Sequence, residues 1–107
     1  KRNLLMTPAD LVQRQDSGEA LQIVDTRSKK DFEKAHVKGA IHIPLAELRE
    51  RSAELDQSLV TITYCNKGVT GNAAQNVLLH HGFTKVYNLS GGNKNYQNYL
   101  KMMKLKK

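Results

Sequence analysis

Apolar runs of strand length alternate with helix-like patterns along the whole chain. The predicted strands are 20–24, 40–43, 59–64 and 85–89, and the predicted helices begin near Pro8, Lys29, Leu45, Asn72 and Lys94. The strand-like runs are bounded by turn residues, whereas the helical stretches space their apolar side chains three or four residues apart. Parallel strands need a crossover connection, usually a helix, between them. The alternation therefore predicts an α/β fold with a mainly parallel sheet and helices on both faces.

The length and composition indicate one globular domain, residues 1–107. The chain is near the commonest domain size, and its 39% apolar and 25% charged residues are ordinary for a globular protein. No apolar run approaches the roughly 18 residues of a membrane-spanning helix, so no membrane span is expected. A single cysteine cannot form an internal disulfide, which favours a reducing, cytoplasmic location. Because the chain starts at Lys1 rather than Met, a domain excised from a larger protein is an alternative.

The formal net charge of +7 lies largely at the two ends of the chain. The basic tail at about 101–107 contributes four lysines, but no aromatic side chains alternate with basic ones in a stacking pattern. No nucleic-acid partner is therefore predicted. The adjacent His80 and His81 do not form a metal-ligand set, so no metal or other cofactor is predicted. His81 falls on the apolar side of its helix and is expected at the edge of the core.

The only cysteine lies between a predicted strand and a predicted helix. Cys65 follows the strand 59–64 and begins the loop Cys65-Asn66-Lys67-Gly68-Val69-Thr70-Gly71. Loop amides and the positive end of a helix dipole both favour a thiolate over a thiol, and Lys67 adds a positive charge. A lone cysteine is often only a small buried apolar residue. Its position in this loop instead predicts a reactive sulfur.

Two other strand ends carry polar or glycine-rich sequences. Asp25-Thr26-Arg27 follows one strand and Ser90-Gly91-Gly92 follows another. Sites in open parallel sheets form at the carboxyl ends of the strands. We therefore expect these two segments to lie beside Cys65. Arg27 either adds positive charge to the rim of the site or forms a structural ion pair with Asp25.

Several short segments, in a fixed order and spacing, form a larger pattern over nearly the entire chain. They are Val24-Asp25-Thr26-Arg27, Phe32-Glu33, the run His36 to Pro44, the Cys65 loop, Gly82-Phe83 and Leu89-Ser90-Gly91-Gly92. In this order they resemble the rhodanese (sulfurtransferase) family. The resemblance implies a small three-layer α/β domain with the active cysteine in a loop between strand and helix.

The resemblance also implies an activity. A family member of this kind moves a sulfane sulfur from thiosulfate or a persulfide to cyanide, a thiol or an acceptor protein, through a persulfide on Cys65. No organic cofactor is implied. The implied donor-binding residues are Asn66, Lys67, Gly68, Val69, Thr70 and Arg27.

The loop departs from commoner family forms at two positions. Asn66 stands where members that use thiosulfate often carry Arg, and Thr70 replaces an Arg found at the loop end in many single-domain members. At Thr70 an anion contact is either absent or made by a hydroxyl group.

Three alternatives to a free-standing sulfurtransferase follow from the same residues. Related phosphatases and arsenate reductases need Cys-x5-Arg, but the matching position here is Gly71. A binding module of this fold usually lacks the cysteine, which this chain keeps. The ending Asn88 to Tyr96 resembles rhodanese domains fused behind flavin-dependent disulfide reductases, which is the third alternative.

Overall fold

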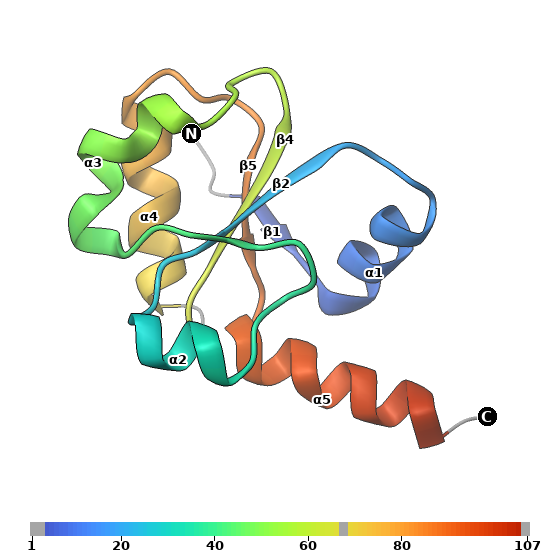
Figure 1. Cartoon of the computed structure of the whole chain (residues 1–107). Coiled ribbons are helices and arrows are strands. Elements are labelled where there is room, and N and C mark those ends of the chain that lie inside the picture. Colours follow the sequence, from blue (N-terminus) through green and yellow to red (C-terminus); the bar gives the residue numbers. More distant parts are fainter. Residues whose placement is uncertain (1–3, 67–68, 106–107) are drawn as a thin grey trace.

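A five-stranded parallel sheet forms the centre of the molecule (Figure 1). The computed structural model describes residues 4–66 and 69–105, with only the backbone for 69–71. The strands are β1 (Leu4–Met6), β2 (Leu21–Asp25), β3 (Ile41–His42), β4 (Val60–Tyr64) and β5 (Val86–Leu89). Their order across the sheet is β1-β5-β4-β2-β3, and all four pairings are parallel. The predicted α/β class is therefore confirmed.

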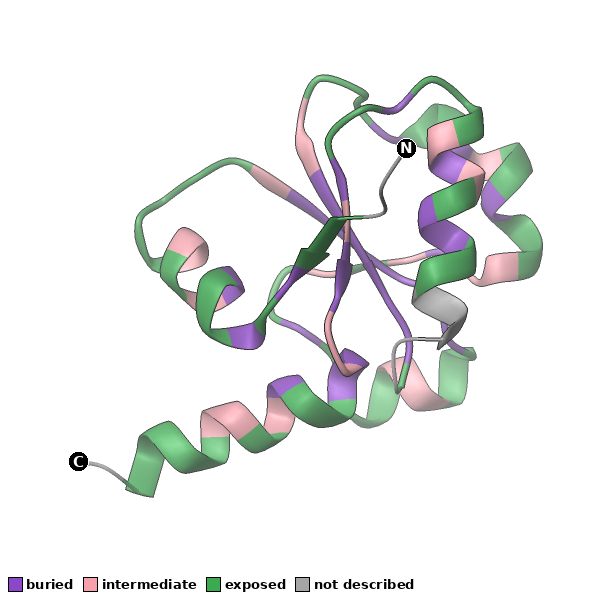
Figure 2. Ribbon diagram, turned by 180° about the vertical axis from the view of Figure 1, so that it is seen from behind, coloured by how far each residue is buried: buried purple, intermediate pink, exposed green. Residues whose placement is uncertain are grey.

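Helices cover both faces of this sheet. They are α1 (Pro8–Asp16), α2 (Lys29–Lys34), α3 (Leu48–Arg51), α4 (Val69–His80) and α5 (Gly92–Leu105). One core cluster joins strand side chains such as Ile62 to α1 and α5 through Leu11 and Tyr96. A second cluster joins Val24 to α3 and α4 through Leu48 and Leu78. Buried side chains thus alternate between the two faces of the sheet, which gives three layers. Figure 2 shows mostly buried central strands between helices that carry many exposed residues.

Local hydrogen bonds explain where the first two helices begin. The Thr7 hydroxyl accepts from the Asp10 amide at 3.1 Å, with Pro8 in the first helical position of α1. The Ser28 hydroxyl accepts from the Asp31 amide at 3.3 Å before α2. Both caps satisfy an amide that has no partner inside its helix. The Ser28 cap, three residues after the end of β2, fixes the start of α2 beside the Cys65 loop.

The helix predicted to begin near Leu45 is not one regular helix. This segment consists of a 3-10 turn (Leu45–Glu47), the short α3 and a second 3-10 turn (Ser52–Glu54). The Ser52 hydroxyl donates to the Arg49 carbonyl at 3.0 Å. Such a local side-chain bond competes with the helical backbone pattern. The segment therefore tightens after α3 instead of continuing as a regular helix.

Three other expectations also differ from the structure. α4 begins at Val69 rather than near Asn72, and α5 begins at Gly92 rather than Lys94. His81 is exposed, not at the core edge, and its ring nitrogen Nδ1 lies 2.8 Å from the Val77 carbonyl oxygen. The local bond to the preceding turn holds this ring at the helix end, away from the core.

The edge strand β1 was not predicted from the sequence. Leu4 and Leu5 are exposed, so the strand shows no buried apolar run. It is held by pairing with β5 and by Gln75 of α4, whose amide nitrogen donates to the Leu4 carbonyl at 2.8 Å. These partners are far away in the sequence, and no local pattern contains them.

The last turns of α5 extend past the sheet, and their apolar side chains Met102 and Leu105 are exposed (Figure 1). Within the described residues, no helix has the length and apolar character needed to span a membrane.

Candidate active site

Cys65 is the first residue after the central strand β4, at its carboxyl end. Its sulfur is not part of a disulfide, and the residue is buried, with 6% of its surface exposed. β4 lies between β2 and β5, so the ends of both neighbouring strands flank Cys65. The predicted convergence of the three strand ends is confirmed by the contacts between them.

On the β2 side, Arg27 forms a buried ion pair with Asp25. The guanidinium Nη2 lies 2.7 Å from the Asp25 Oδ2 atom, and the two side chains are 5% and 0% exposed. Arg27 Nε also donates to both Asp25 oxygens, at 3.0 and 3.1 Å. Burial alone lowers the pKa of Arg27, but hydrogen bonding and charge attraction from Asp25 outweigh this effect and raise it. The guanidinium is therefore a fixed cation.

Tyr64, the residue before Cys65, completes the environment of this pair. Its hydroxyl donates to Asp25 Oδ2 at 2.7 Å and accepts from the Val37 amide at 3.0 Å. Burial raises the pKa of the Tyr64 phenol, so the hydroxyl keeps the proton that it donates. The last strand residue before the cysteine is thus tied to the end of β2.

Asn66 connects this network to the cysteine loop. Its Oδ1 atom accepts from Arg27 Nη1 at 2.9 Å, and its Nδ2 atom donates to Asp31 of α2 at 3.3 Å. The second guanidinium nitrogen, Nη2, also donates to the Ala35 carbonyl at 2.6 Å. An arginine at position 66 could not accept from Arg27, since a guanidinium has no acceptor atom. In this chain, the Asn66 side chain therefore provides the acceptor through which Arg27 holds the loop.

On the β5 side, the first turn of α5 holds the backbone of the same loop. The Asn93 amide donates to the Cys65 carbonyl at 2.7 Å, and the Lys94 amide donates to the Asn66 carbonyl at 3.2 Å. Amides of a first helical turn have no partner inside their own helix. The loop carbonyls supply those partners, so α5 and the loop fix each other's position.

Gly92 permits this close approach. It has φ +64°, and a Cβ atom there would overlap the Cys65 carbonyl oxygen and lie 2.6 Å from the Asn66 carbonyl carbon. Both the backbone conformation and the available space therefore require glycine. The sequence motif Ser90-Gly91-Gly92 thus has a specific physical role at the cysteine loop.

The remaining predicted site residues are described only in part. Lys67 and Gly68 lie outside the described residues. Val69 and Thr70 belong to the first turn of α4, and only their backbone is described. Arg27 is not at an open rim; its guanidinium contacts Asp25, Ala35 and Asn66. This geometry matches the structural alternative for Arg27.

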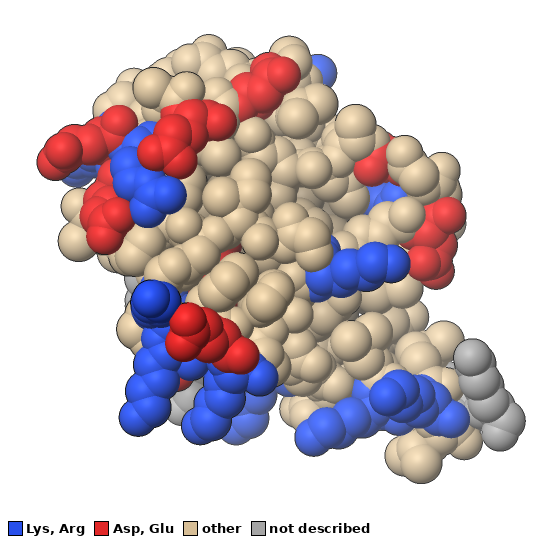
Figure 3. Space-filling model, in the orientation of Figure 1, with Lys and Arg blue, Asp and Glu red and all other residues tan. Residues whose placement is uncertain are grey.

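Basic side chains surround the site on the α2 side. Lys29, Lys30 and Lys34 are exposed on α2, which Asn66 contacts through Asp31. Figure 3 shows Lys and Arg side chains gathered over α2 and along α5, whereas acidic ones gather over α3. A positive surface raises the local concentration of anions.

Sequence reasoning missed Tyr64 and Asn93 as parts of the site. Tyr64 appeared only as the end of a strand, and Asn93 acts through its backbone amide, which carries no residue signature. Among the described residues, no group of three or more His, Cys, Asp or Glu side chains is arranged to hold a metal ion.

A family model described as "Rhodanese-like domain" matches residues 7–99 of the chain. The thiosulfate sulfurtransferase GlpE of Coxiella burnetii is 31% identical over 83 residues, which are 78% of this chain and 74% of that protein. The putative sulfur carrier protein YrkF of Bacillus subtilis is 38% identical over 80 residues, 75% of this chain and 43% of that protein.

Solved structures share the fold. The crystal structure of reduced Bacillus anthracis CoADR-RHD is 28% identical, with a TM-score of 0.83 over 94% of this chain and 17% of that one. The chain thus spans less than half of YrkF and a sixth of the Bacillus anthracis protein.

Proposed function

The chain belongs to the rhodanese-like family, and on that premise we propose that it is a sulfurtransferase with Cys65 as its nucleophile. The observation that carries this proposal is the position of Cys65 at the end of the central strand, in a loop held from both sides. Thiosulfate or an organic persulfide is the donor, and cyanide, a thiol or an acceptor protein takes the sulfur.

In the first step, the Cys65 thiolate attacks the outer sulfur of the donor. With thiosulfate, a new S–S bond forms to Cys65, the S–S bond of the donor breaks, and its electron pair leaves with sulfite. The product is a Cys65 persulfide with one negative charge. The lysines of α2 attract the doubly charged donor, and loop amides stabilise the anion.

In the second step, the acceptor attacks the outer sulfur of the persulfide. The S–S bond to Cys65 breaks, and its electron pair returns to Cys65 as a thiolate. When cyanide is the acceptor, the product is thiocyanate. When a thiolate is the acceptor, the product is a new persulfide. The outer sulfur lies about 2 Å beyond Sγ, which favours attack on a cysteine whose own side chain is mostly buried.

Mass measurement of the intact protein tests this proposal. After incubation with thiosulfate, we expect the protein to gain one sulfur atom, which cyanide or dithiothreitol removes. The Cys65→Ser variant should gain nothing. If neither thiosulfate, polysulfide nor glutathione persulfide loads the wild type, the binding-module alternative is favoured. Cys65-dependent hydrolysis of an aryl phosphate would instead favour a phosphatase.

A role within a larger protein is the second candidate. It is supported by the match to the Bacillus anthracis CoADR-RHD structure, of which this chain spans 17%. The alternative of a rhodanese domain fused to a flavin disulfide reductase assigns the same chemistry to Cys65 but a protein-bound donor or acceptor.

Lys67 is proposed to attract the anionic donor. We expect Lys67→Ala to raise the KM for thiosulfate about fivefold, which corresponds to the loss of roughly 1 kcal/mol of charge-assisted binding. The rate of transfer from loaded protein to cyanide should change less. Lys101→Ala removes the same charge from the exposed surface of α5 and serves as the control. Equal KM values in the two variants would remove Lys67 from the site.

A further inference from the structure

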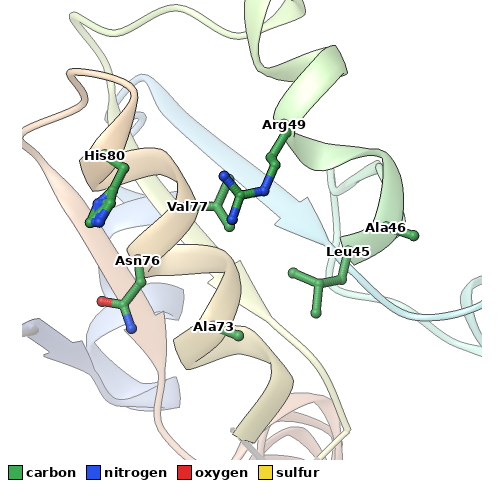
Figure 4. Close-up of a pocket in the computed structure, with 7 residues that line it drawn as sticks. All are labelled: Leu45, Ala46, Arg49, Ala73, Asn76, Val77 and His80. Carbon is green, nitrogen blue, oxygen red and sulfur yellow. The ribbon is translucent and has the colours of Figure 1, made fainter.

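A groove of about 450 Å³ lies between α4 and the segment that includes α3. Its walls are the α4 residues Ala73, Asn76, Val77 and His80, opposite Leu45 and Arg49. Figure 4 shows the Arg49 side chain projecting from α3 into the space between the two walls. The groove therefore combines an apolar lining with one guanidinium and two polar side chains.

Arg49 differs from the other arginines that the structure describes. Arg14 pairs with Glu19, Arg27 with Asp25, and Arg51 with both Glu47 and Glu54. Among the arginines that the structure describes, Arg49 alone has no carboxylate within ion-pair distance. The nearby Glu47 and Glu54 are already bound to Arg51. Arg49 is therefore a cation in a groove, available to an external anion.

Backbone hydrogen bonds link the Leu45 end of the groove to the carboxyl end of β4. The Leu45 amide donates to the Thr26 carbonyl at 3.2 Å, and the Thr26 amide donates to the carbonyl of Tyr64 at 3.1 Å. Leu45 is thus two backbone hydrogen bonds away from the residue before Cys65. On the opposite wall, Ala73 lies about 6 Å along α4 from Val69, at 1.5 Å per residue.

We propose that this groove binds the body of the sulfur acceptor, a thiol that carries a carboxylate, with Arg49 as the carboxylate partner. The inference rests on the sulfurtransferase function proposed above. Val77 lies about 12 Å along α4 from Val69. An acceptor that reaches from Cys65 into the groove is therefore of peptide size, since three extended residues span about 10 Å. Asn76 and His80 supply further polar contacts, and Leu45 and Val77 contact its apolar part.

Competing acceptors provide the kinetic test. For each variant, the kcat/KM with glutathione is divided by the kcat/KM with cyanide, which is too small to occupy the groove. We expect Arg49→Gln to lower this ratio about fivefold, and Arg49→Glu to lower it further, because an exposed ion pair or charged hydrogen bond has about this strength. Arg14→Gln is the matched control, with the same charge change on α1, outside the groove, and should leave the ratio unchanged.

A binding measurement separates this inference from the chemistry. S-methylglutathione is added to the Cys65→Ser protein, and amide NMR shifts are recorded. We expect shifts at Ala73, Asn76 and Val77 that disappear in the Cys65→Ser, Arg49→Gln double variant. If these amides do not respond, or if the kinetic ratio is equal in Arg49→Gln and Arg14→Gln, the groove is not the acceptor site. If thiosulfate, polysulfide and glutathione persulfide all fail to load the wild type while the shifts are present, the sulfurtransferase function is overturned and only a ligand groove is left.

Discussion

Replacing Gly92 by Ala is expected to lower the free energy of unfolding by about 3 kcal/mol and to slow sulfur loading at least tenfold. The left-handed backbone costs an alanine roughly 1 kcal/mol. The rest comes from overlap with backbone atoms of Cys65 and Asn66, which cannot rotate away as a side chain would. Relief of that overlap has to move α5 or the cysteine loop. Either shift weakens the bonds from Asn93 and Lys94 to the loop carbonyls.

The Gly18→Ala variant is a control for the cost of placing alanine in a left-handed backbone conformation. Gly18 has φ +81°, and a Cβ atom there would meet nothing within 4 Å. Its substitution should cost only the roughly 1 kcal/mol of left-handed strain. Chemical denaturation gives both free energies, and intact mass after timed thiosulfate exposure gives the loading rates. If Gly92→Ala and Gly18→Ala have equal unfolding free energies and equal loading rates, Gly92 is not required for the contact between α5 and the cysteine loop.

Replacing Arg27 by Met is expected to lower the free energy of unfolding by about 3–5 kcal/mol. Asp25 is fully buried, so loss of Arg27 leaves a buried carboxylate without its cation. Asn66 and the Ala35 carbonyl lose a donor at the same time. Arg14→Met is the comparison, because its partner Glu19 is on the surface and such pairs contribute about 1 kcal/mol or less. A similar loss in the two variants would contradict a structural role for the buried pair.

The Arg27→Lys variant tests whether Arg27 positions the loop or binds the donor. Lysine keeps the charge but lacks the planar group that bonds Asp25, Ala35 and Asn66 together. A positioning role predicts a lower kcat with a nearly unchanged KM for thiosulfate. A rise confined to the KM would instead assign Arg27 to direct donor binding.

Most of the fold could be predicted from the sequence because its determinants are local. Apolar runs mark β2, β4 and β5, and the capping residues Thr7 and Ser28 mark the helix starts. The parallel arrangement follows from the alternation of strands and helices. The edge strand β1 could not be predicted, because it depends on pairing with β5, about eighty residues later.

The layout of the candidate site was predictable to a similar extent. The cysteine, its loop and the two neighbouring strand ends could be identified, since each carries an unusual residue type or motif. The role of Asn66 could not, because it depends on Arg27 and Asp31, which are brought together only by the fold. The role of the α5 amides could not be predicted either, because they act through the backbone and the identity of their side chains gives no sign of it.

The dependence of the cysteine loop on α5 also has a consequence for biosynthesis. Chains emerge from the ribosome at about 5–20 residues per second, N-terminal end first. Cys65 appears well before Asn93 and Lys94, which later bind the carbonyls of the loop. We therefore expect the Cys65 loop of the nascent chain to lack its folded conformation until α5 is complete. Until then, the Cys65 thiol is accessible to oxidants. Truncation before Gly92 should then leave a cysteine that alkylating reagents modify rapidly but that thiosulfate does not load.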